Sequence, residues 1–126
     1  MIGAIIGDIA GSIYEWNPIK TKDFPLLPDK CFFTDDTVLT VAIADSIVSN
    51  SSYLQSVRKI GARYPNSGYG GSFRKWLYSP VTEPYNSWGN GSAMRVSPVG
   101  FAFDTKEDVL REAKNTSIIT HDDPEG

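Results

Sequence analysis

The segment that begins at Thr34 constrains the fold most, because it joins a helix-start signal to a long apolar run. The range Thr34–Thr37 consists of two aspartates between two threonines, and the run that follows has no acid before Asp45. Threonine is a favourable N-cap residue, and the backbone dipole stabilises each acid in a first helical turn by about 0.3–1 kcal/mol. The sequence therefore predicts a helix from Thr34 to about Ser49.

The rest of the chain also favours helices, and the alternation typical of β-strands is absent. Isoleucines recur at helical spacing over residues 2–13, and further helices are predicted over 52–64 and around 73–77. Another helix is predicted from Ser92, with Pro98 and Gly100 expected to end or bend it. The final helix follows a sequence that resembles a capping box, residues 105–108. Loops are predicted over 16–33 and 79–91. The fold class predicted is all-α, as a single domain over residues 1–126.

The first predicted helix carries two stripes. Glycines four residues apart form one face, on which a helix or a ligand could approach the backbone closely; they are Gly3, Gly7 and Gly11. Polar residues form a second stripe on a helix whose other residues look buried; they are Asp8, Ser12 and Glu15.

Composition excludes several classes of protein. The net charge is -3 with no dense basic block, which disfavours a nucleic-acid backbone as partner. Cys31 is the only cysteine and His121 the only histidine, so a disulfide within the chain and zinc sites built on histidine pairs are excluded. The apolar N-terminus carries Asp8 and lacks a leading basic residue, unlike a signal peptide or a membrane span. We therefore expect a cytoplasmic protein without membrane contact.

Two groups of residues are candidates for chemistry. Four acids lie near apolar sequence, and burying them unpaired is costly; they are Asp8, Glu15, Asp35 and Asp36. Carboxylate and hydroxyl oxygens suit a hard cation such as Mg²⁺, although solvated acids that cap helices are the alternative. The small residues of Gly89–Ser92 precede a predicted helix and suit a phosphate, although a plain turn is the alternative.

Taken together, the motifs resemble those of one family. Gly7–Glu15, Phe33–Thr37, Gly89–Arg95 and Thr120–His121 occur in the order seen in ADP-ribosylglycohydrolases. That family includes dinitrogenase reductase-activating glycohydrolases and ADP-ribosyl-acceptor hydrolases. The resemblance implies an all-α protein that holds two Mg²⁺ ions, or Mn²⁺ in some members. It also implies hydrolysis of the N- or O-glycosidic bond between ADP-ribose and an acceptor. The expected partner is an ADP-ribosylated protein or a small ADP-ribose conjugate.

The resemblance also implies roles for individual residues. Two acids are implied in catalysis, Glu15 and Asp36. One part of the metal site is implied at Thr34, Asp35 and Asp36. The diphosphate of the substrate is expected to contact a turn formed by Gly89, Asn90, Gly91 and Ser92. His121 is expected to line the ligand cleft.

Two departures from the family pattern affect these expectations. Asp123 stands where many relatives have a second histidine, and the chain stops at Gly126, before the late Asp-x-Asp-Ser/Thr motif that supplies the other metal ligands. We expect the N-terminal part of such an enzyme, with an incomplete metal site. Apolar faces that the absent helices would cover favour a homo-oligomer or a missing C-terminal half as partner.

Two alternatives remain open from the sequence. The first is a non-catalytic relative that binds ADP-ribose or self-associates, because the C-terminal metal ligands are lacking. The second is an unrelated helical interaction domain with capped acidic helices. In that case, alanine at Asp35 and Asp36 removes only capping energy, about 1–2 kcal/mol.

Overall fold

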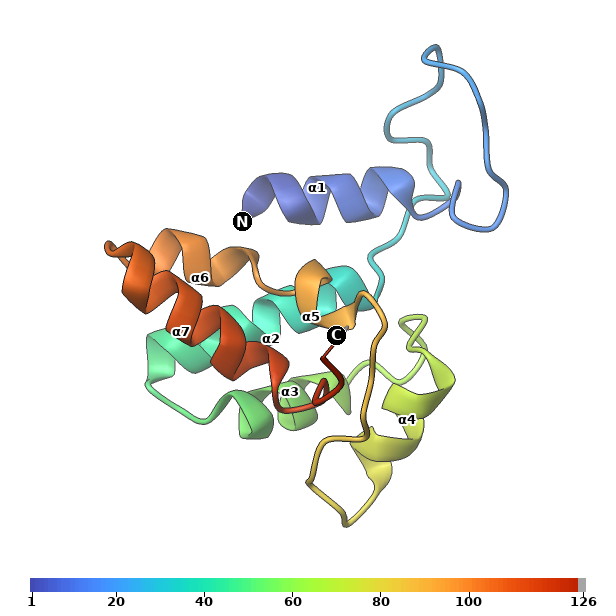
Figure 1. The fold of residues 1–126 in the computed structure, drawn as a ribbon. Helices are drawn as coiled ribbons and strands as arrows, with labels where there is room; N and C mark the ends of the chain where they lie inside the picture. The colour runs from blue at the N-terminus through green and yellow to red at the C-terminus, as the bar shows by residue number, and fades with distance from the viewer. Residues whose placement is uncertain (125–126) are drawn as a thin grey trace.

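The computed structural model describes residues 1–124, and over that range it contains seven helices and no strand (Figure 1). The predicted all-α fold class is therefore confirmed. The helices are α1 (Ile2–Gly11), α2 (Asp35–Ser49), α3 (Tyr53–Gly61), α4 (Gly71–Tyr78), α5 (Gly91–Met94), α6 (Ser97–Ala102) and α7 (Lys106–Ser117). Residues 12–34 form a long excursion between α1 and α2 (Figure 1).

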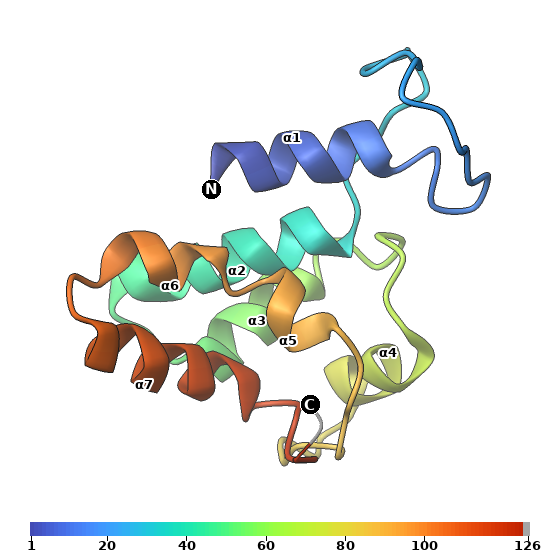
Figure 2. The same ribbon diagram turned by 45° about the horizontal axis from the view of Figure 1, so that its top comes forward.

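The central element is α2, which contacts α1, α3, α5 and α6 (Figure 2). Its apolar run explains this position, because a helix with few polar faces must be covered by others. Each large side chain buried in this way contributes about 1.5–3 kcal/mol. The buried core comprises Val38, Leu39, Ala42 and Ile43 from α2, together with Val57, Ile60, Tyr69, Phe73, Trp76, Leu77 and Val99.

Both ends of α2 follow from local chemistry. The Thr34 side chain accepts a hydrogen bond from the Asp36 backbone N–H at 3.3 Å, as expected of an N-cap. Asn50 follows the helix in the left-handed conformation with φ 50°, which asparagine tolerates better than most residues. The predicted helix from Thr34 to about Ser49 is confirmed with these boundaries.

The helix predicted from Ser92, which Pro98 and Gly100 were expected to end or bend, is instead two short helices, α5 and α6, and the interruption falls before Pro98. Pro98 lies in the first turn of α6, where its missing N–H leaves no hydrogen bond unmade. Gly100 stays inside α6. The prediction for α7 is confirmed, because the Thr105 side chain accepts a hydrogen bond from the Asp108 backbone N–H at 3.1 Å.

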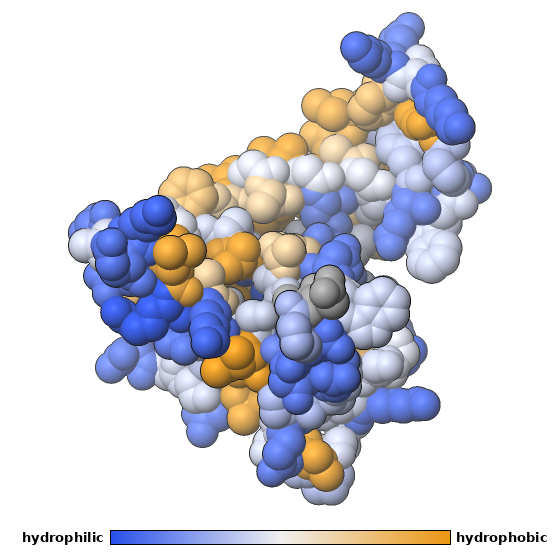
Figure 3. Space-filling model, viewed as in Figure 1, coloured by the Kyte–Doolittle hydropathy of each residue, from blue (hydrophilic) through white to orange (hydrophobic). Residues whose placement is uncertain are grey.

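The first helix differs from its prediction in two ways. It ends at Gly11, so Glu15 does not lie on it. It is also poorly covered, since Ile2 is 75% exposed, Ile6 is 47% exposed and Ala10 is its one buried residue. Added side chains at its three glycines would touch nothing within 4 Å. Apolar colour follows α1 in the space-filling view (Figure 3). Isoleucine periodicity identified the helix correctly but not the degree of its burial.

None of the helices within residues 1–124 combines the length and the apolar character needed to cross a bilayer.

Candidate functional site

One end of the site is the junction between α1 and α2, where Asp8 accepts hydrogen bonds from two threonines. The Thr34 backbone N–H and hydroxyl donate to the Asp8 carboxylate at 2.8 and 2.6 Å. The Thr37 backbone N–H donates to it at 3.2 Å, and the Thr37 hydroxyl donates to the same oxygen. Hydrogen bonds to a carboxylate are stronger than neutral ones. The predicted metal ligand Thr34 is therefore buried, engaged with Asp8 and serving as an N-cap.

The two acids that open α2 are in a different electrostatic position. Burial raises the pKa of Asp35, and together with the negative charges of Asp36, Glu15 and Asp8 it brings that pKa to about 6. Burial also raises the pKa of Asp36, with the charge of Asp8 adding to the effect. Within residues 1–124, no lysine or arginine forms an ion pair with either carboxylate. These acids share one negative region, in which no ion pair with a cation of residues 1–124 compensates them.

A cavity of about 220 Å³ opens beside this region, between α2, α4 and α5. It brings one predicted metal ligand together with most of the predicted substrate-binding residues. The predicted residues that line it are Asp35, Gly89, Asn90, Gly91 and His121. Aromatic side chains complete one wall, Phe73 and Tyr85. The remaining predicted residues do not line it; they are Glu15, Thr34, Asp36 and Ser92.

Ser92 faces another depression, which His121 and Asp123 also line. His121 therefore stands between the two hollows. Asp123, the residue that departs from the family pattern, accepts a hydrogen bond from the Asn86 side chain at 3.4 Å.

The predicted metal residues fit a cation chemically but form only part of a site. Oxygen donors with raised pKa values and no cationic partner suit a hard divalent ion. Within the part of the chain that the structure describes, however, no three His, Cys, Asp or Glu side chains gather as metal ligands. The remaining ligands would have to come from outside these residues.

The far side of the cavity is built on a buried arginine that sequence reasoning missed. Arg95 is 0% exposed and donates to the Thr116 carbonyl at 2.8 Å and to the Thr120 hydroxyl at 2.7 Å. Burial lowers the pKa of Arg95 to about 10. Its partners lie 21 and 25 residues further along the chain, so no local pattern points to them.

His121 is held next to Arg95 and faces the turn. Its Nδ1 lies 2.7 Å from the Thr120 hydroxyl, and its Nε2 lies 3.1 Å from the Gly89 carbonyl oxygen. A side chain added at Gly91 would touch the imidazole Cε1 at 3.4 Å, so the ring packs directly over the turn. Burial lowers the pKa of His121, and the positive charge of Arg95 lowers it further. The imidazole is thus a buried, neutral group at the edge of the cavity.

An all-α chain with this cavity and these motifs matches one family model. The model for ADP-ribosylglycohydrolase matches residues 1–126. The chain therefore belongs to the ADP-ribosylglycohydrolase family.

Similarity to individual proteins agrees with that family. The chain is 26% identical to ADP-ribosylhydrolase ARH3 of Xenopus tropicalis, over 96% of this chain and 43% of the relative. It is 27% identical to the ARH3 proteins of Mus musculus and Homo sapiens, over 96% of this chain and 42% and 43% of those relatives. The chain spans less than half the length of these curated relatives.

Proposed function

We propose that this chain forms part of a hydrolase that releases ADP-ribose from an acceptor by cleaving an N- or O-glycosidic bond. The observation that carries the proposal is the cavity, where Asp35 meets the Gly89–Gly91 turn and His121 in a member of the ADP-ribosylglycohydrolase family. The similarity to ADP-ribosylhydrolase ARH3 supports the same reaction class.

In this proposal the Gly89–Ser92 turn contacts the diphosphate of ADP-ribose and His121 lines the ligand cleft. Backbone N–H groups of small residues suit phosphate oxygens, because no side chain keeps the anion at a distance. The described residues place Gly89, Asn90 and Gly91 at the cavity wall, which supports the assignment. Ser92 lines the neighbouring depression instead, beside His121.

Thr34, Asp35 and Asp36 would hold a divalent cation, Mg²⁺ or Mn²⁺, together with ligands from outside these residues. When bound, such an ion polarises the substrate oxygens and orients a water. The chain's own acids would act beside it. Glu15 and Asp36 are the proposed catalytic carboxylates, because negative charge stabilises the oxocarbenium-like transition state of glycoside cleavage.

The proposed partner is an ADP-ribosylated protein or a small ADP-ribose conjugate in the cytoplasm. The exposed apolar residues of α1 favour a covering polypeptide, either a second copy of the chain or further helices of the same domain.

The first test is isothermal titration of the chain with ADP-ribose in excess Mg²⁺ and again in EDTA. We expect binding that needs Mg²⁺, is lost in Asp35→Asn/Asp36→Asn, and survives in Asp108→Asn. Asp108 is the matched control because it also lies in the first turn of a Thr-capped helix.

Each other result would count against a stated part of the proposal. Equal binding in EDTA would contradict the metal site, and no binding in either buffer would contradict a ligand site built from these residues. Mg²⁺-dependent binding without release of ADP-ribose from a modified protein would contradict catalysis and favour a non-catalytic ADP-ribose-binding relative.

A further inference from the structure

The histidine beside the cavity lies at the end of a buried chain of hydrogen bonds that starts at Arg95. Arg95 contacts the Thr120 hydroxyl, that hydroxyl contacts His121 Nδ1, and His121 Nε2 contacts the Gly89 carbonyl. Arg95 and Thr120 are 0% exposed, and His121 is 4% exposed. Water therefore has little access to replace any of the three contacts.

The chemistry of the two ends fixes the direction of every bond in the chain. A guanidinium can only donate, so the Thr120 oxygen accepts from Arg95. A carbonyl can only accept, so His121 Nε2 must carry a hydrogen to bond with Gly89. In a neutral imidazole Nδ1 then has no hydrogen, and the Thr120 hydroxyl must donate to it. All the donors point the same way, from Arg95 towards Gly89.

The doubly protonated imidazole is disfavoured at this position. Arg95 is a buried cation that forms no ion pair with an acid of residues 1–124, so a second buried positive charge would be repelled. The hydrogen bond to the Gly89 carbonyl and the charge of Asp122 act in the opposite direction, but burial and Arg95 outweigh them and the pKa of His121 is lowered.

We propose that Arg95 and Thr120 are positioning residues, which hold His121 as the neutral Nε2–H tautomer and through it hold the Gly89–Gly91 turn against the cavity. A second hydrogen bond joins Thr120 to the residues just before the turn, since the Ser87 backbone N–H donates to the Thr120 carbonyl at 3.3 Å. The Asn90 side chain makes no capping hydrogen bond to α5, so these external contacts add to the local ones of the turn, such as that of the Gly89 backbone N–H to the Ser87 hydroxyl at 3.3 Å. The consequence for ADP-ribose rests on the proposed function; the tautomer does not.

The experiment uses His121 as the only histidine, so ¹⁵N-histidine labelling gives a single pair of ring-nitrogen signals. At neutral pH without ligand, we expect one protonated nitrogen, identified as Nε2 by its couplings to both ring carbon-bound protons. Thr120→Val removes the donor to Nδ1, and we expect a mixture of tautomers and altered amide signals at Gly89 and Gly91. Thr120→Ser keeps the hydroxyl and should restore the single tautomer.

The matched control is Thr116→Val. Thr116 is as buried as Thr120, but its hydroxyl donates to the Ala113 carbonyl, and Arg95 uses only its backbone oxygen. We expect this variant to leave the ring-nitrogen signals unchanged. An Nδ1–H or doubly protonated imidazole in the unmodified chain, or equal changes in both valine variants, would overturn the proposal. If Thr120→Val does not fold, a changed tautomer in Thr120→Ser would overturn it instead.

Titration with ADP-ribose in Mg²⁺ separates the two proposals. Thr120→Val should weaken binding about tenfold, or about 1.4 kcal/mol, whereas Thr120→Ser and Thr116→Val should not. If the unmodified chain binds no ADP-ribose but shows the Nε2–H tautomer, the proposed function fails and the positioning role stands. Unchanged affinity in a Thr120→Val chain with mixed tautomers would overturn the link between the histidine and the turn.

Discussion

Two helices of this chain begin in the same way and end up in opposite electrostatic surroundings. Both α2 and α7 follow a threonine N-cap and carry two acids in the first turn. Thr34 accepts a backbone N–H at 3.3 Å and Thr105 accepts one at 3.1 Å, so the capping chemistry is nearly identical. Taken alone, the sequence of either segment predicts a helix that starts after its threonine.

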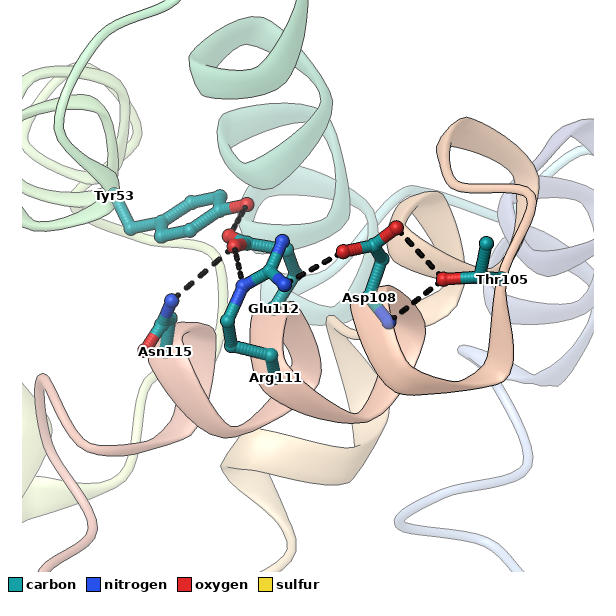
Figure 4. Close-up of polar contacts among 6 residues, drawn as sticks. All are labelled: Tyr53, Thr105, Asp108, Arg111, Glu112 and Asn115. Carbon is teal, nitrogen blue, oxygen red and sulfur yellow. Dashed lines mark hydrogen bonds and ion pairs between the residues drawn. The ribbon is translucent and has the colours of Figure 1, made fainter.

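Two acids of α7, Asp108 and Glu112, are compensated by their neighbours (Figure 4). Asp108 accepts from the Thr105 hydroxyl and pairs with Arg111 at 2.6 Å, and these contacts lower its pKa. Glu112, one turn further along, accepts from Tyr53 of α3 at 3.0 Å. The two first-turn acids of α2, Asp35 and Asp36, form no such ion pair within the described residues, and the pKa of both is raised. The comparison teaches that the same cap motif can lead to opposite pKa shifts in the acids that follow it, because the surroundings decide the direction of the shift.

The largest expected effect is at Asp8, a carboxylate of α1 that accepts hydrogen bonds from the start of α2. This contact is the feature that distinguishes the start of α2 from that of α7. Asp8→Ala removes the acceptor of four hydrogen bonds, two of them from the backbone N–H groups of Thr34, the N-cap, and Thr37, in the first turn of α2. We expect a loss of about 3 kcal/mol in the free energy of unfolding by urea. Asp108→Ala, at the start of α7, is the control; an equal loss in both variants would remove the distinction between the two helices.

Removing the two N-caps should separate the helices next. Thr34→Val deletes a cap and also a donor to Asp8, so we expect about 2 kcal/mol of destabilisation. Thr105→Val deletes an exposed cap and should lose about 1 kcal/mol. Urea unfolding of both variants measures the difference, and a larger loss for Thr105→Val would contradict the order.

The pH dependence of stability should have opposite signs at the two helices. In EDTA, folded Asp35 binds its proton more tightly than the unfolded chain does, since its pKa rises from 3.8 to about 6. Stability from this residue therefore falls as pH rises through that window. Asp35→Asn should remove the fall and stabilise the protein at pH 7 by about 1–2 kcal/mol, a value reduced for the partial solvent screening of the carboxylate.

At α7 the lowered pKa of Asp108 means that its contribution is present above the ordinary aspartate pKa and is lost as pH falls. Asp108→Asn should therefore weaken stability at pH 7 rather than raise it. Urea midpoints measured between pH 4 and about pH 8 would check both variants. A gain in both, or in neither, would show that the two acidic turns are electrostatically alike.

The smallest expected effect is at the exposed pair that compensates α7. Arg111→Gln removes the ion pair with Asp108, but both side chains are exposed and salt screens them. We expect no measurable change of the urea midpoint at physiological salt and a slight decrease at low salt. A marked decrease of the urea midpoint at high salt would mean that Arg111 stabilises α7 by more than its charge.

The all-α class and the starts of helices could be predicted from the sequence, because both depend on residues that are neighbours in the chain. Thr34 and Thr105 cap the helices that their sequences indicate, and one face of the apolar run after Thr34 lies in the core, whereas Val48 is exposed. An interruption near Pro98 was predicted but its place was not, because proline both opens and ends helices, and only the path of the chain decides between them. Burial of α1 was misjudged because periodicity identifies an apolar face but not a partner to cover it.

The candidate site was predicted residue by residue from motifs, but its supporting contacts were not. Asp8 reaches α2 across 26 and 29 residues, and Arg95 reaches the end of α7 across 21 and 25. A buried arginine opposes the usual preference of charged residues for the surface, so no sequence pattern would have placed it there. Such contacts become visible only once the helices are arranged in space.

The way in which α1 is attached has a consequence for local opening of the molecule. Ala10 is its one buried residue, so lifting α1 away exposes little additional apolar surface to water. The polar contacts of Asp8 are then the main resistance to that motion, and the amides of α1 should exchange with solvent deuterium before those of α2. When α1 leaves, Thr34 and Thr37 lose the carboxylate they share. Opening at one end of the chain would therefore loosen the first turn of the helix that carries Asp35 and Asp36.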